Sequence, residues 1–595
     1  MRKKAFELQQ LYCGDNSSVD YTAYCQLNDA LKSELNSIRD QFRESIKTAD
    51  SLVSQFSAGS VEIEVRNQYY EVMKQISLDC SEKMANFSEK VIRESVDIIH
   101  TPPPCTFEAV AIGSIARGEA TPYSDLEYLF LVDESTPESM CYFETLSMIS
   151  YFLMGDLGET KLSYMAVQEL HGWFDDKAKN GFKIDGLAKG AGNIPTGHSP
   201  KNKNHFIVTP EMLANKFKAI LNRPERDEAL RGDLTSMLTY TKSLYSYQNE
   251  DKQLLQRFRS LINAIPKNQS RTEINMEMLQ KDARKFNFAP DIKLSQKGFN
   301  VDVKKELYRF PSILLLDVCI VSECAENTSW ASLESLAQSG AVSLGLCGSL
   351  KFLLAAAAHV RLSTYLHHDS HDDRMSLTQQ SAALTETLSL KVNTDQSSRR
   401  WFVPSELFTA MCSLMIPLKG HLGKKDFKKE DLATFSEETD PWWSRVTTLY
   451  YSGNYTQALS ILKQKCADLC GKPVQSALHI LSSLPHFMNN VLFIVSETLY
   501  WCGEHRAALQ LYQYTSENNI GDTRERIADC KRMLGKNDQA IKILSSITEK
   551  SASVYYSLGH AYKNVAQYQM AEQSFLHALQ RDLSSMTSPP LTDYY

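Results

Sequence analysis

The segment that most constrains the fold of this chain covers residues 111–132, AIGSIARGEATPYSDLEYLFLV. Its apolar beginning fits the end of a strand, and the pair Gly113-Ser114 then permits a tight turn of the backbone. Residues 115–118 allow one helical turn, which Pro122 closes. Residues 125–132 are rich in strand formers. The segment therefore predicts a strand, a tight turn and a second strand.

Two acidic side chains, Asp125 and Glu127, occupy alternate positions of the second predicted strand. Because strand side chains alternate between faces, both carboxylates are expected on one face and their apolar neighbours on the other. Two such charges are costly to bury without a partner, and a divalent cation is the usual remedy. Oxygen ligands of this type suit Mg²⁺. A glycine turn followed by an ordinary strand with two solvated acids is the alternative interpretation.

The turn before these acids has features that suit phosphate. The backbone N–H groups of Gly113 and Ser114 lie near a predicted helix start, which favours phosphate oxygens. Arg117 adds a guanidinium that can bind phosphate as a charged fork. The carboxylates of Asp125 and Glu127 would then hold metal ions between a nucleoside triphosphate and an attacking hydroxyl. The combination favours a nucleotide site over the alternative of solvated acids.

This stretch resembles the nucleotidyltransferases of the DNA polymerase β superfamily, in particular the N-terminal domain of the PII-protein uridylyltransferases. Their pattern is a Gly-Ser, an Arg-Gly-Glu and then Ser-Asp-x-Asp on the next strand. The matching residues are Gly113, Ser114, Arg117, Gly118, Glu119, Ser124 and Asp125. Glu127 departs from the pattern, because the usual second Asp is one methylene shorter, although Glu is accepted there in parts of the superfamily. The resemblance implies an α/β nucleotidyltransferase core, with Ser124 among the nucleotide-binding residues and Mg²⁺, or alternatively Mn²⁺, as cofactor.

The resemblance also implies a third carboxylate from a neighbouring strand, which helps to activate the acceptor hydroxyl. Asp185 is the candidate, because residues 181–186 fit a short strand that ends in an acid and a glycine. With Asp125 and Glu127 it would complete the catalytic and metal-binding set. An Asp-Gly turn that closes a hairpin explains the same residues, and both interpretations stay open.

Residues 301–321 resemble the segment that links the catalytic core of those uridylyltransferases to a helical substrate-binding domain. Four polar side chains of this segment would face the triphosphate across the cleft: Asp302, Lys304, Lys305 and Arg309. Further along, His371-Asp372 has the form of the His-Asp doublet in the phosphohydrolase domain of the same proteins. The other His and Asp ligands of that domain have no counterpart here, so a helix end followed by a loop is the favoured interpretation.

Internal repeats occupy the last section of the chain. Ala458, Ala508, Ala540 and Ala571 recur at spacings of 50, 32 and 31 residues, and the last two spacings are close to the tetratricopeptide period of about 34 residues. The signature of that repeat is matched best by Leu558-Gly559, Tyr562, Ala571, Phe575 and Ala578-Leu579. Such repeats stack into an α-solenoid that binds proteins on its concave face. A helical bundle with accidental phase is the less favoured alternative.

Composition limits the remaining possibilities. The net charge of −7 argues against a broad nucleic-acid surface, so nucleic acid is the less favoured partner. The 13 cysteines include no CxxC pair, which favours reduced, buried thiols and a cytoplasmic location. No apolar core follows the basic start of the chain, so no secretory signal is expected. Residues 342–360 are the most apolar long stretch but contain Lys351, so a buried helix is expected and not a membrane span.

The length of 595 residues predicts about four domains, and these patterns place the boundaries. The predicted fold is an α/β nucleotidyltransferase core, with a mixed sheet and helices, embedded in a mainly helical chain that ends in the solenoid. The predicted parts are a helical N-terminal region (1–100), the nucleotidyltransferase core (101–215), a helical connection (216–300), a helical substrate-binding domain (301–430), tetratricopeptide-like repeats (437–585) and a disordered tail (586–595).

The sequence as a whole therefore predicts a Mg²⁺-dependent nucleotidyltransferase. It would move a nucleoside monophosphate group from a nucleoside triphosphate to an acceptor hydroxyl on a protein and release pyrophosphate, mainly by positioning and charge neutralisation. The alternative is a scaffold in which the repeats bind proteins and the nucleotidyltransferase fold is weakly active or inactive. A transferase that modifies nucleic acid is a third, less favoured possibility because of the net charge.

Overall fold

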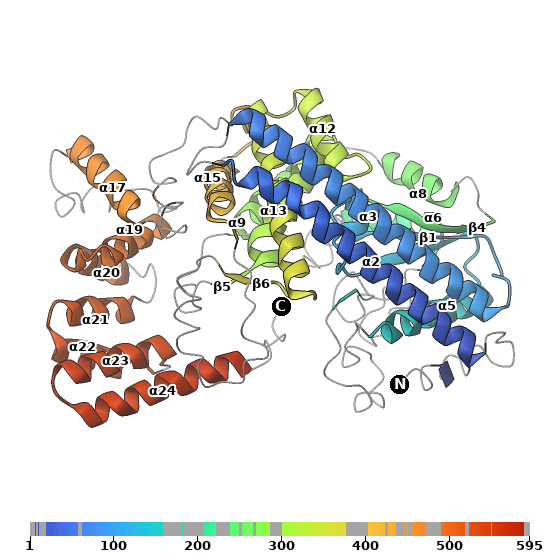
Figure 1. The fold of residues 1–595 in the computed structure, drawn as a ribbon. Helices are drawn as coiled ribbons and strands as arrows, with labels where there is room; N and C mark the ends of the chain where they lie inside the picture. Colours follow the sequence, from blue (N-terminus) through green and yellow to red (C-terminus); the bar gives the residue numbers. More distant parts are fainter. Residues whose placement is uncertain are drawn as a thin grey trace.

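The computed structural model shows a mainly helical chain with a small mixed sheet (Figure 1). It describes residues 6–7, 10, 20–56, 62–158, 181–182, 207–221, 239–248, 253–265, 269–285, 300–376, 403–422, 427–435, 446, 449, 455–470, 489–517, 523–548 and 550–587.

Four short strands form the sheet, in the order β3-β2-β1-β4. They are β1 (Phe107–Ala111), β2 (Tyr128–Val132), β3 (Ile207–Val208) and β4 (Lys242–Tyr247). The central strand β1 is antiparallel to both β2 and β4, whereas β2 and β3 are parallel. The strand predicted immediately before the Gly-Ser turn is confirmed, and that turn joins two neighbouring strands of the sheet.

The second strand begins later than the sequence predicts. It starts at Tyr128, three residues after Asp125, so the predicted start was wrong. The antiparallel pairing nevertheless extends back by one step, because the Ile112 N–H donates to the Glu127 carbonyl at 2.9 Å. Asp125 and Glu127 are partly exposed in this approach, while the alternate residue Leu126 is buried. The predicted alternation of polar and apolar side chains is therefore present just ahead of the strand.

Helices cover both faces of the sheet. On one face, Phe107 and Phe130 pack their rings against Phe143 of α5 (Pro137–Asp156). On the other face, Val110 and Leu129 share a smaller apolar cluster with α6 (Pro210–Leu221) and α8 (Gln253–Asn263). Every residue of β1 and β2 is buried, and all but Glu108 have apolar or aromatic side chains. This explains the continuous apolar run that the second strand shows in the sequence.

Two long helices run side by side along the molecule, α2 (Tyr21–Val53) and α3 (Ile63–Ile99) (Figure 1). Their buried positions follow helical spacing; for α2 these include Leu31, Leu35, Ile38, Phe42 and Ile46. The chain leaves α3 through His100, which has a left-handed backbone, directly before the three prolines at 102–104. Both helices belong to the same hydrophobic core as the α5 face of the sheet.

A bundle of helices follows the sheet in sequence and packs against α3. Its elements are α9 (Gln269–Lys285), the π-helical segment η4 (Val303–Tyr308), α11 (Arg309–Ser322), α12 (Ser329–Ser339), α13 (Leu344–His368), α15 (Ser405–Leu422) and the 3₁₀ turn η5 (Lys429–Ala433). A two-stranded antiparallel ribbon, β5 (Asn300–Asp302) with β6 (Arg374–Ser376), lies at the end of α13. Strand β5 leads through η4 into α11, whose third residue is Pro311.

The apolar stretch at 342–360 forms most of α13. Among the described residues, α13 is the one helix that is long and apolar enough to cross a membrane, judged by length and composition alone. Of its most apolar 18-residue stretch, 78% is buried inside the protein. Its burial agrees with the sequence prediction of a core helix.

The C-terminal section is a succession of helices that pack against their neighbours in order. They are α17 (Tyr455–Cys470), α19 (Asn489–Trp501), α20 (His505–Glu517), α21 (Arg524–Met533), α22 (Asn537–Ser545), α23 (Ala552–Asn564) and α24 (Tyr568–Thr587). Gly503 and Gly535 turn the chain between helices with φ of 81° and 77°. Helix α24 extends two residues into the predicted tail, and residues 588–595 lie outside the described part.

Candidate functional site

The turn after β1 and the acid pair before β2 meet in space. Gly113 begins the short helix α4 (Gly113–Arg117) with φ of +69°. A Cβ atom at Gly113 would lie 1.5 Å from Oε2 of Glu127. The Glu127 carboxylate therefore occupies the space beside the Gly113 backbone, and both this contact and the positive φ require glycine. The two halves of the sequence motif are in direct contact.

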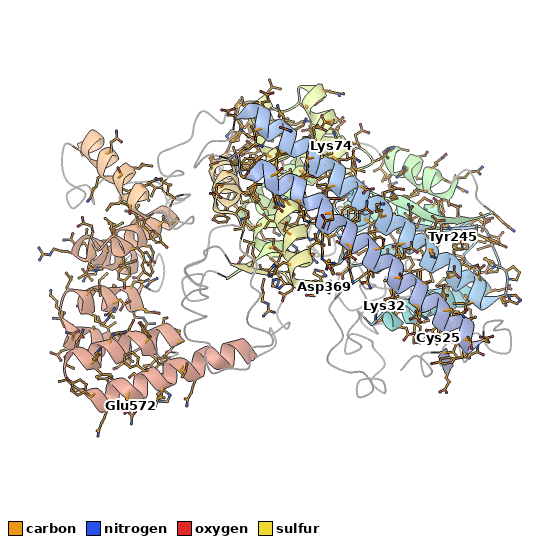
Figure 2. The ribbon with its side chains drawn as sticks, in the orientation of Figure 1. Cys25, Lys32, Lys74, Tyr245, Asp369 and Glu572 are labelled. Atoms are coloured by element: carbon orange, nitrogen blue, oxygen red, sulfur yellow. The ribbon has the colours of Figure 1, made fainter. Side chains whose placement is uncertain are left out.

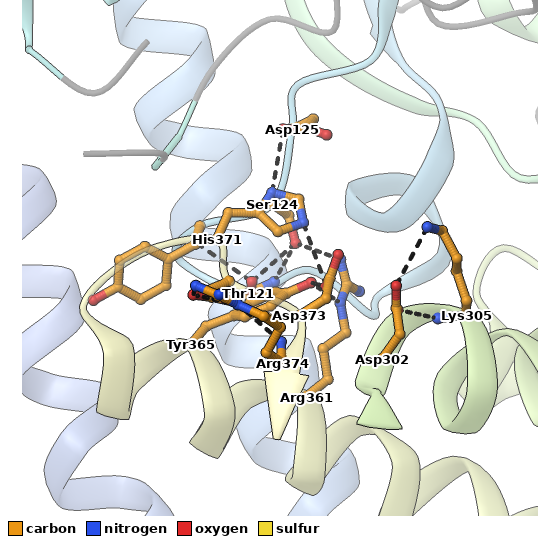
Figure 3. Close-up of polar contacts among 12 residues, drawn as sticks. Thr121, Ser124, Asp125, Asp302, Lys305, Arg361, Tyr365, His371, Asp373 and Arg374 are labelled. Carbon is orange, nitrogen blue, oxygen red and sulfur yellow. Dashed lines mark hydrogen bonds and ion pairs between the residues drawn. The ribbon is translucent and has the colours of Figure 1, made fainter. Parts of the chain in front are cut away.

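Asp125 contacts a residue from a distant part of the chain. Its Oδ1 lies 3.5 Å from Nδ1 of His371, whose other ring nitrogen, Nε2, lies 3.8 Å from Oδ1 of Asp373 (Figure 3). His371 belongs to the loop between α13 and β6, and its side chain is 6% exposed. The prediction of a helix end and loop at this position is confirmed, since α13 ends at His368.

Sequence reasoning did not place His371 at this site. It considered the histidine only as part of a His-Asp doublet for a separate phosphohydrolase domain. The one available signal was the density of polar residues, HHDSHDD, directly after a long apolar helix. Such a run is more often a solvated loop, and sequence spacing alone does not show which strand it approaches.

Arg117 points into the protein. Its Nε lies 3.4 Å from Oε2 of Glu119, and the Arg117 side chain is 17% exposed. Burial opposes the charge on Arg117, but Tyr308, Glu119 and Glu127 outweigh that effect and raise its pKa above the ordinary value. Arg117 is therefore a permanent cation close to Glu119 and Glu127, with its charge compensated inside the protein.

Glu119 is the centre of a buried hydrogen-bond network. Its side chain has no exposed area, and its carboxylate accepts hydrogen bonds from the hydroxyls of Tyr308, Ser312 (2.7 Å) and Ser329. Burial alone would raise the pKa of Glu119, but Arg117 and these hydroxyl donors lower it overall. Because the three donors come from η4, α11 and α12, this carboxylate fastens the loop after α4 to the helical bundle.

Two further contacts hold the same loop from the bundle. The Trp330 indole N–H donates to the Gly118 carbonyl at 2.7 Å. Arg361, buried on α13, donates from Nη1 to the Glu119 carbonyl (3.5 Å) and from Nη2 to Ser124 Oγ (3.3 Å). Ser124 Oγ also accepts the Thr121 backbone N–H at 2.8 Å. The structure thus gives Ser124, predicted to bind nucleotide, a role in shaping the loop that leads to Asp125.

The long N-terminal helices contact this loop as well. On α2, Arg43 Nη2 lies 2.8 Å from Asp369 Oδ1, and the Tyr123 hydroxyl donates to the same oxygen at 2.8 Å (Asp369 is labelled in Figure 2). Arg39 stacks over the Tyr123 ring at 4.1 Å. On α3, Ser81 Oγ accepts the Ala120 N–H at 2.9 Å. The segment before Asp125 is therefore fixed from two directions.

The segment predicted to face the triphosphate, which includes Asp302 and Lys305, lies beside the Asp125–His371 contact (Figure 3). Asp302 caps η4 by accepting the Lys305 N–H at 2.8 Å, and Lys305 Nζ lies 3.3 Å from Asp302 Oδ2. Lys305 is 68% exposed along its side chain, Arg309 is exposed and Lys304 is partly exposed. These side chains stand next to the loop that carries His371, because the Val303 N–H donates to the Asp373 carbonyl at 2.7 Å.

Of the three predicted metal ligands, the structure describes Asp125 and Glu127. Asp125 and Glu127 supply two partly exposed carboxylates, which is the donor chemistry that Mg²⁺ takes. Asp185 lies outside the described residues. Within the described ranges, no group of three or more His, Cys, Asp or Glu side chains is arranged to hold a metal ion.

Comparison with known proteins adds no assignment. No protein-family model matches the chain, and no curated protein matches its sequence.

Proposed function

We propose that this chain is a Mg²⁺-dependent nucleotidyltransferase that moves a nucleoside monophosphate group from a nucleoside triphosphate to an acceptor hydroxyl on a protein, with release of pyrophosphate. The observation that carries the proposal is the contact between Glu127 and the Gly113 turn. It brings a carboxylate, the left-handed turn at Gly113 and the neighbouring Asp125 to one partly exposed edge of the sheet. A nucleotidyltransferase fold of the DNA polymerase β type requires this association.

Each residue has a role in the proposed site. Asp125 and Glu127 hold the metal ions, and Asp185 completes the set and orients the acceptor hydroxyl. Bound Mg²⁺ would neutralise charge on the triphosphate and polarise the phosphorus under attack. Gly113 and Ser114 offer backbone N–H groups to phosphate, and Lys305 supplies an exposed cation from the bundle. Arg117 acts on Glu127, where its positive charge favours the ionised form of that carboxylate.

We propose that the C-terminal helices are tetratricopeptide-like repeats that select a protein partner. Their sequential packing and a small residue at a helix contact support this: a Cβ at Gly559 of α23 would lie 2.6 Å from the Phe575 ring of α24. Buried charge also joins α19 to α21 across the intervening helix in sequence, since Arg526 Nε lies 2.7 Å from Oε1 of the fully buried Glu497. A cytoplasmic location remains part of the proposal, and ten of the cysteines in the described ranges are free thiols.

The test is nucleotide binding and transfer by the full-length protein. Calorimetric titration with each of the four nucleoside triphosphates, with and without Mg²⁺, should show metal-dependent binding to at least one. Asp125→Asn, which keeps the side-chain volume, should abolish that dependence and the release of labelled pyrophosphate. The matched control is Asp133→Asn, because Asp133 is an exposed acid just after β2. Full transfer activity in Asp125→Asn would refute the proposal.

A scaffold without transferase activity is the second candidate, and a specific observation favours it. The Glu127 carboxylate fills the space next to Gly113, and Arg117 is compensated by Glu119, so two groups expected at the phosphates are engaged inside the protein. The same titrations separate the candidates, because a scaffold of this kind would show no Mg²⁺-dependent nucleotide binding while the repeats still bound their partner.

A further inference from the structure

We infer that His371 is a positioning residue for the Asp125 carboxylate, supplied to the metal site by the helical bundle. The inference rests on the proposed function, since it assigns to Asp125 the role of metal ligand. Metal-binding carboxylates are themselves commonly held by a second layer of side chains, and that layer sets the orientation of the ligand oxygens. His371 is the described histidine that contacts an acid of the motif, at 3.5 Å between Nδ1 and Asp125 Oδ1.

The position of the His371 ring is fixed by its surroundings. The ring packs against Tyr365 with a centroid distance of 4.7 Å, and its Nε2 faces Asp373 Oδ1 at 3.8 Å. Asp373 is held in turn by a hydrogen bond from the Tyr365 hydroxyl, and the Tyr365 hydroxyl accepts from Arg361 Nε at 3.4 Å. The chain of contacts from Arg361 to Asp125 therefore leaves the imidazole little freedom to turn.

The loop that carries His371 is also fastened at both ends. At its start, Asp369 is bound by Arg43 and Tyr123, each at 2.8 Å. At its end, the Asp373 carbonyl accepts the Val303 N–H at 2.7 Å, and the ribbon of β5 and β6 follows. A loop held in this way presents the imidazole to Asp125 at a defined place. The bundle thus contributes a side chain to the metal site without contributing a ligand.

This assignment distinguishes two effects of replacing His371. If the histidine only fills space, a side chain of similar shape preserves the metal site. If it positions Asp125 through its ring nitrogen, a side chain without a nitrogen weakens metal binding even when the fold is intact. Asparagine places a polar atom near the position of Nδ1, whereas phenylalanine keeps the aromatic packing on Tyr365 and offers no donor.

The experiment measures Mn²⁺ binding to the nucleotide-free, full-length protein by electron paramagnetic resonance, so that the readout is independent of activity. His371→Phe should weaken Mn²⁺ binding about tenfold or more, the range found when such supporting residues are removed. His371→Asn should keep most of the affinity. His367→Phe is the matched control, because His367 is exposed in the last turn of α13. His371→Leu replaces the Phe variant if circular dichroism shows that Phe prevents folding.

The outcomes separate this inference from the proposed function. Equal Mn²⁺ affinity in the wild type and in a folded His371→Phe or His371→Leu protein would overturn the positioning role and leave the nucleotidyltransferase proposal standing. A His371→Asn protein that loses as much affinity as the Phe variant would also overturn it. A wild-type protein that binds no Mn²⁺ would overturn the proposed function, and the role of His371 with it.

Discussion

Replacing Gly113 by alanine tests whether Glu127 and the turn are in contact as the structure shows. The new Cβ would lie 1.5 Å from Oε2 and 2.8 Å from Cδ of Glu127, so the carboxylate must leave its place. Alanine must also adopt the φ of +69° that glycine tolerates. The two effects have separate causes, and a second substitution, Glu127→Ala, removes only the first.

The magnitudes follow from these two effects. The left-handed backbone costs a non-glycine residue about 1–2 kcal/mol. Forcing a side chain out of an occupied space costs about 1–3 kcal/mol more. Gly113→Ala should therefore destabilise the site by about 2–5 kcal/mol in the wild type but by only about 1–2 kcal/mol in the Glu127→Ala background. The coupling between the two positions is the difference, about 1–3 kcal/mol.

Amide hydrogen exchange of peptides that cover residues 107–132 measures the local stability of β1, the turn and β2. The Ile112 N–H reports on it directly, because it donates to the Glu127 carbonyl across the two strands. A coupling of about 1–3 kcal/mol corresponds to exchange that is about 5- to 150-fold faster in the single variant than the backbone effect alone predicts. Gly155→Ala, on α5, is the control, because no atom lies within 4 Å of a Cβ there. If Gly113→Ala lowers the local stability by the same amount in the wild type and in the Glu127→Ala background, the contact is absent and the reasoning fails.

Two further predictions concern the buried network and the repeats. Glu119→Gln should destabilise the protein by about 3–5 kcal/mol at neutral pH, because it removes the carboxylate that is paired with the buried Arg117. Since the folded-state pKa of Glu119 lies below its ordinary 4.5, the stabilisation is present above about pH 4.5 and is lost as the pH falls through the lowered pKa. Urea denaturation of both proteins between pH 7 and pH 3 should show the difference shrinking in acid, and a constant difference would contradict this. Gly559→Ala should lower the stability of the repeat helices by about 1–3 kcal/mol, because the new methyl group pushes α23 away from the Phe575 ring. Circular dichroism should show the thermal transition at a lower temperature. The double variant Gly559→Ala/Phe575→Leu should recover most of that loss of stability. An unchanged transition in the single variant would exclude the close packing of these helices.

Local features of this fold could be predicted because they depend on neighbouring residues. The strand before Gly113 and the buried helix after residue 342 follow from turn residues and apolar patterns. The start of β2 was placed three residues early, because the alternation of polar and apolar side chains begins ahead of the strand. The alternation of Asp125 and Glu127 with buried neighbours was still predicted correctly.

The partners of the motif's charged side chains could not be predicted. Glu119 is an acidic residue of a type that is seldom fully buried, and nothing in its neighbourhood indicates that hydroxyls of Tyr308 and Ser329 surround it. The approach of His371 to Asp125 is likewise set by how α13 and its loop pack against the sheet. Such contacts between segments far apart in sequence depend on tertiary packing, which residue patterns along the chain do not encode.

The network around Glu119 bears on how this α/β unit can be cut out or transplanted. A fragment that ends near residue 215 would keep β1, the Gly113 turn and β2 but would lose β4 from the sheet. It would also leave the Glu119 carboxylate without its three hydroxyl donors and Gly118 without the indole of Trp330. Arg361 would be lost from both the Glu119 carbonyl and Ser124. The smallest excisable unit that preserves the geometry before Asp125 therefore extends from α2 through β6. A graft onto another scaffold must carry α2, α3, η4, α11, α12 and α13 with it.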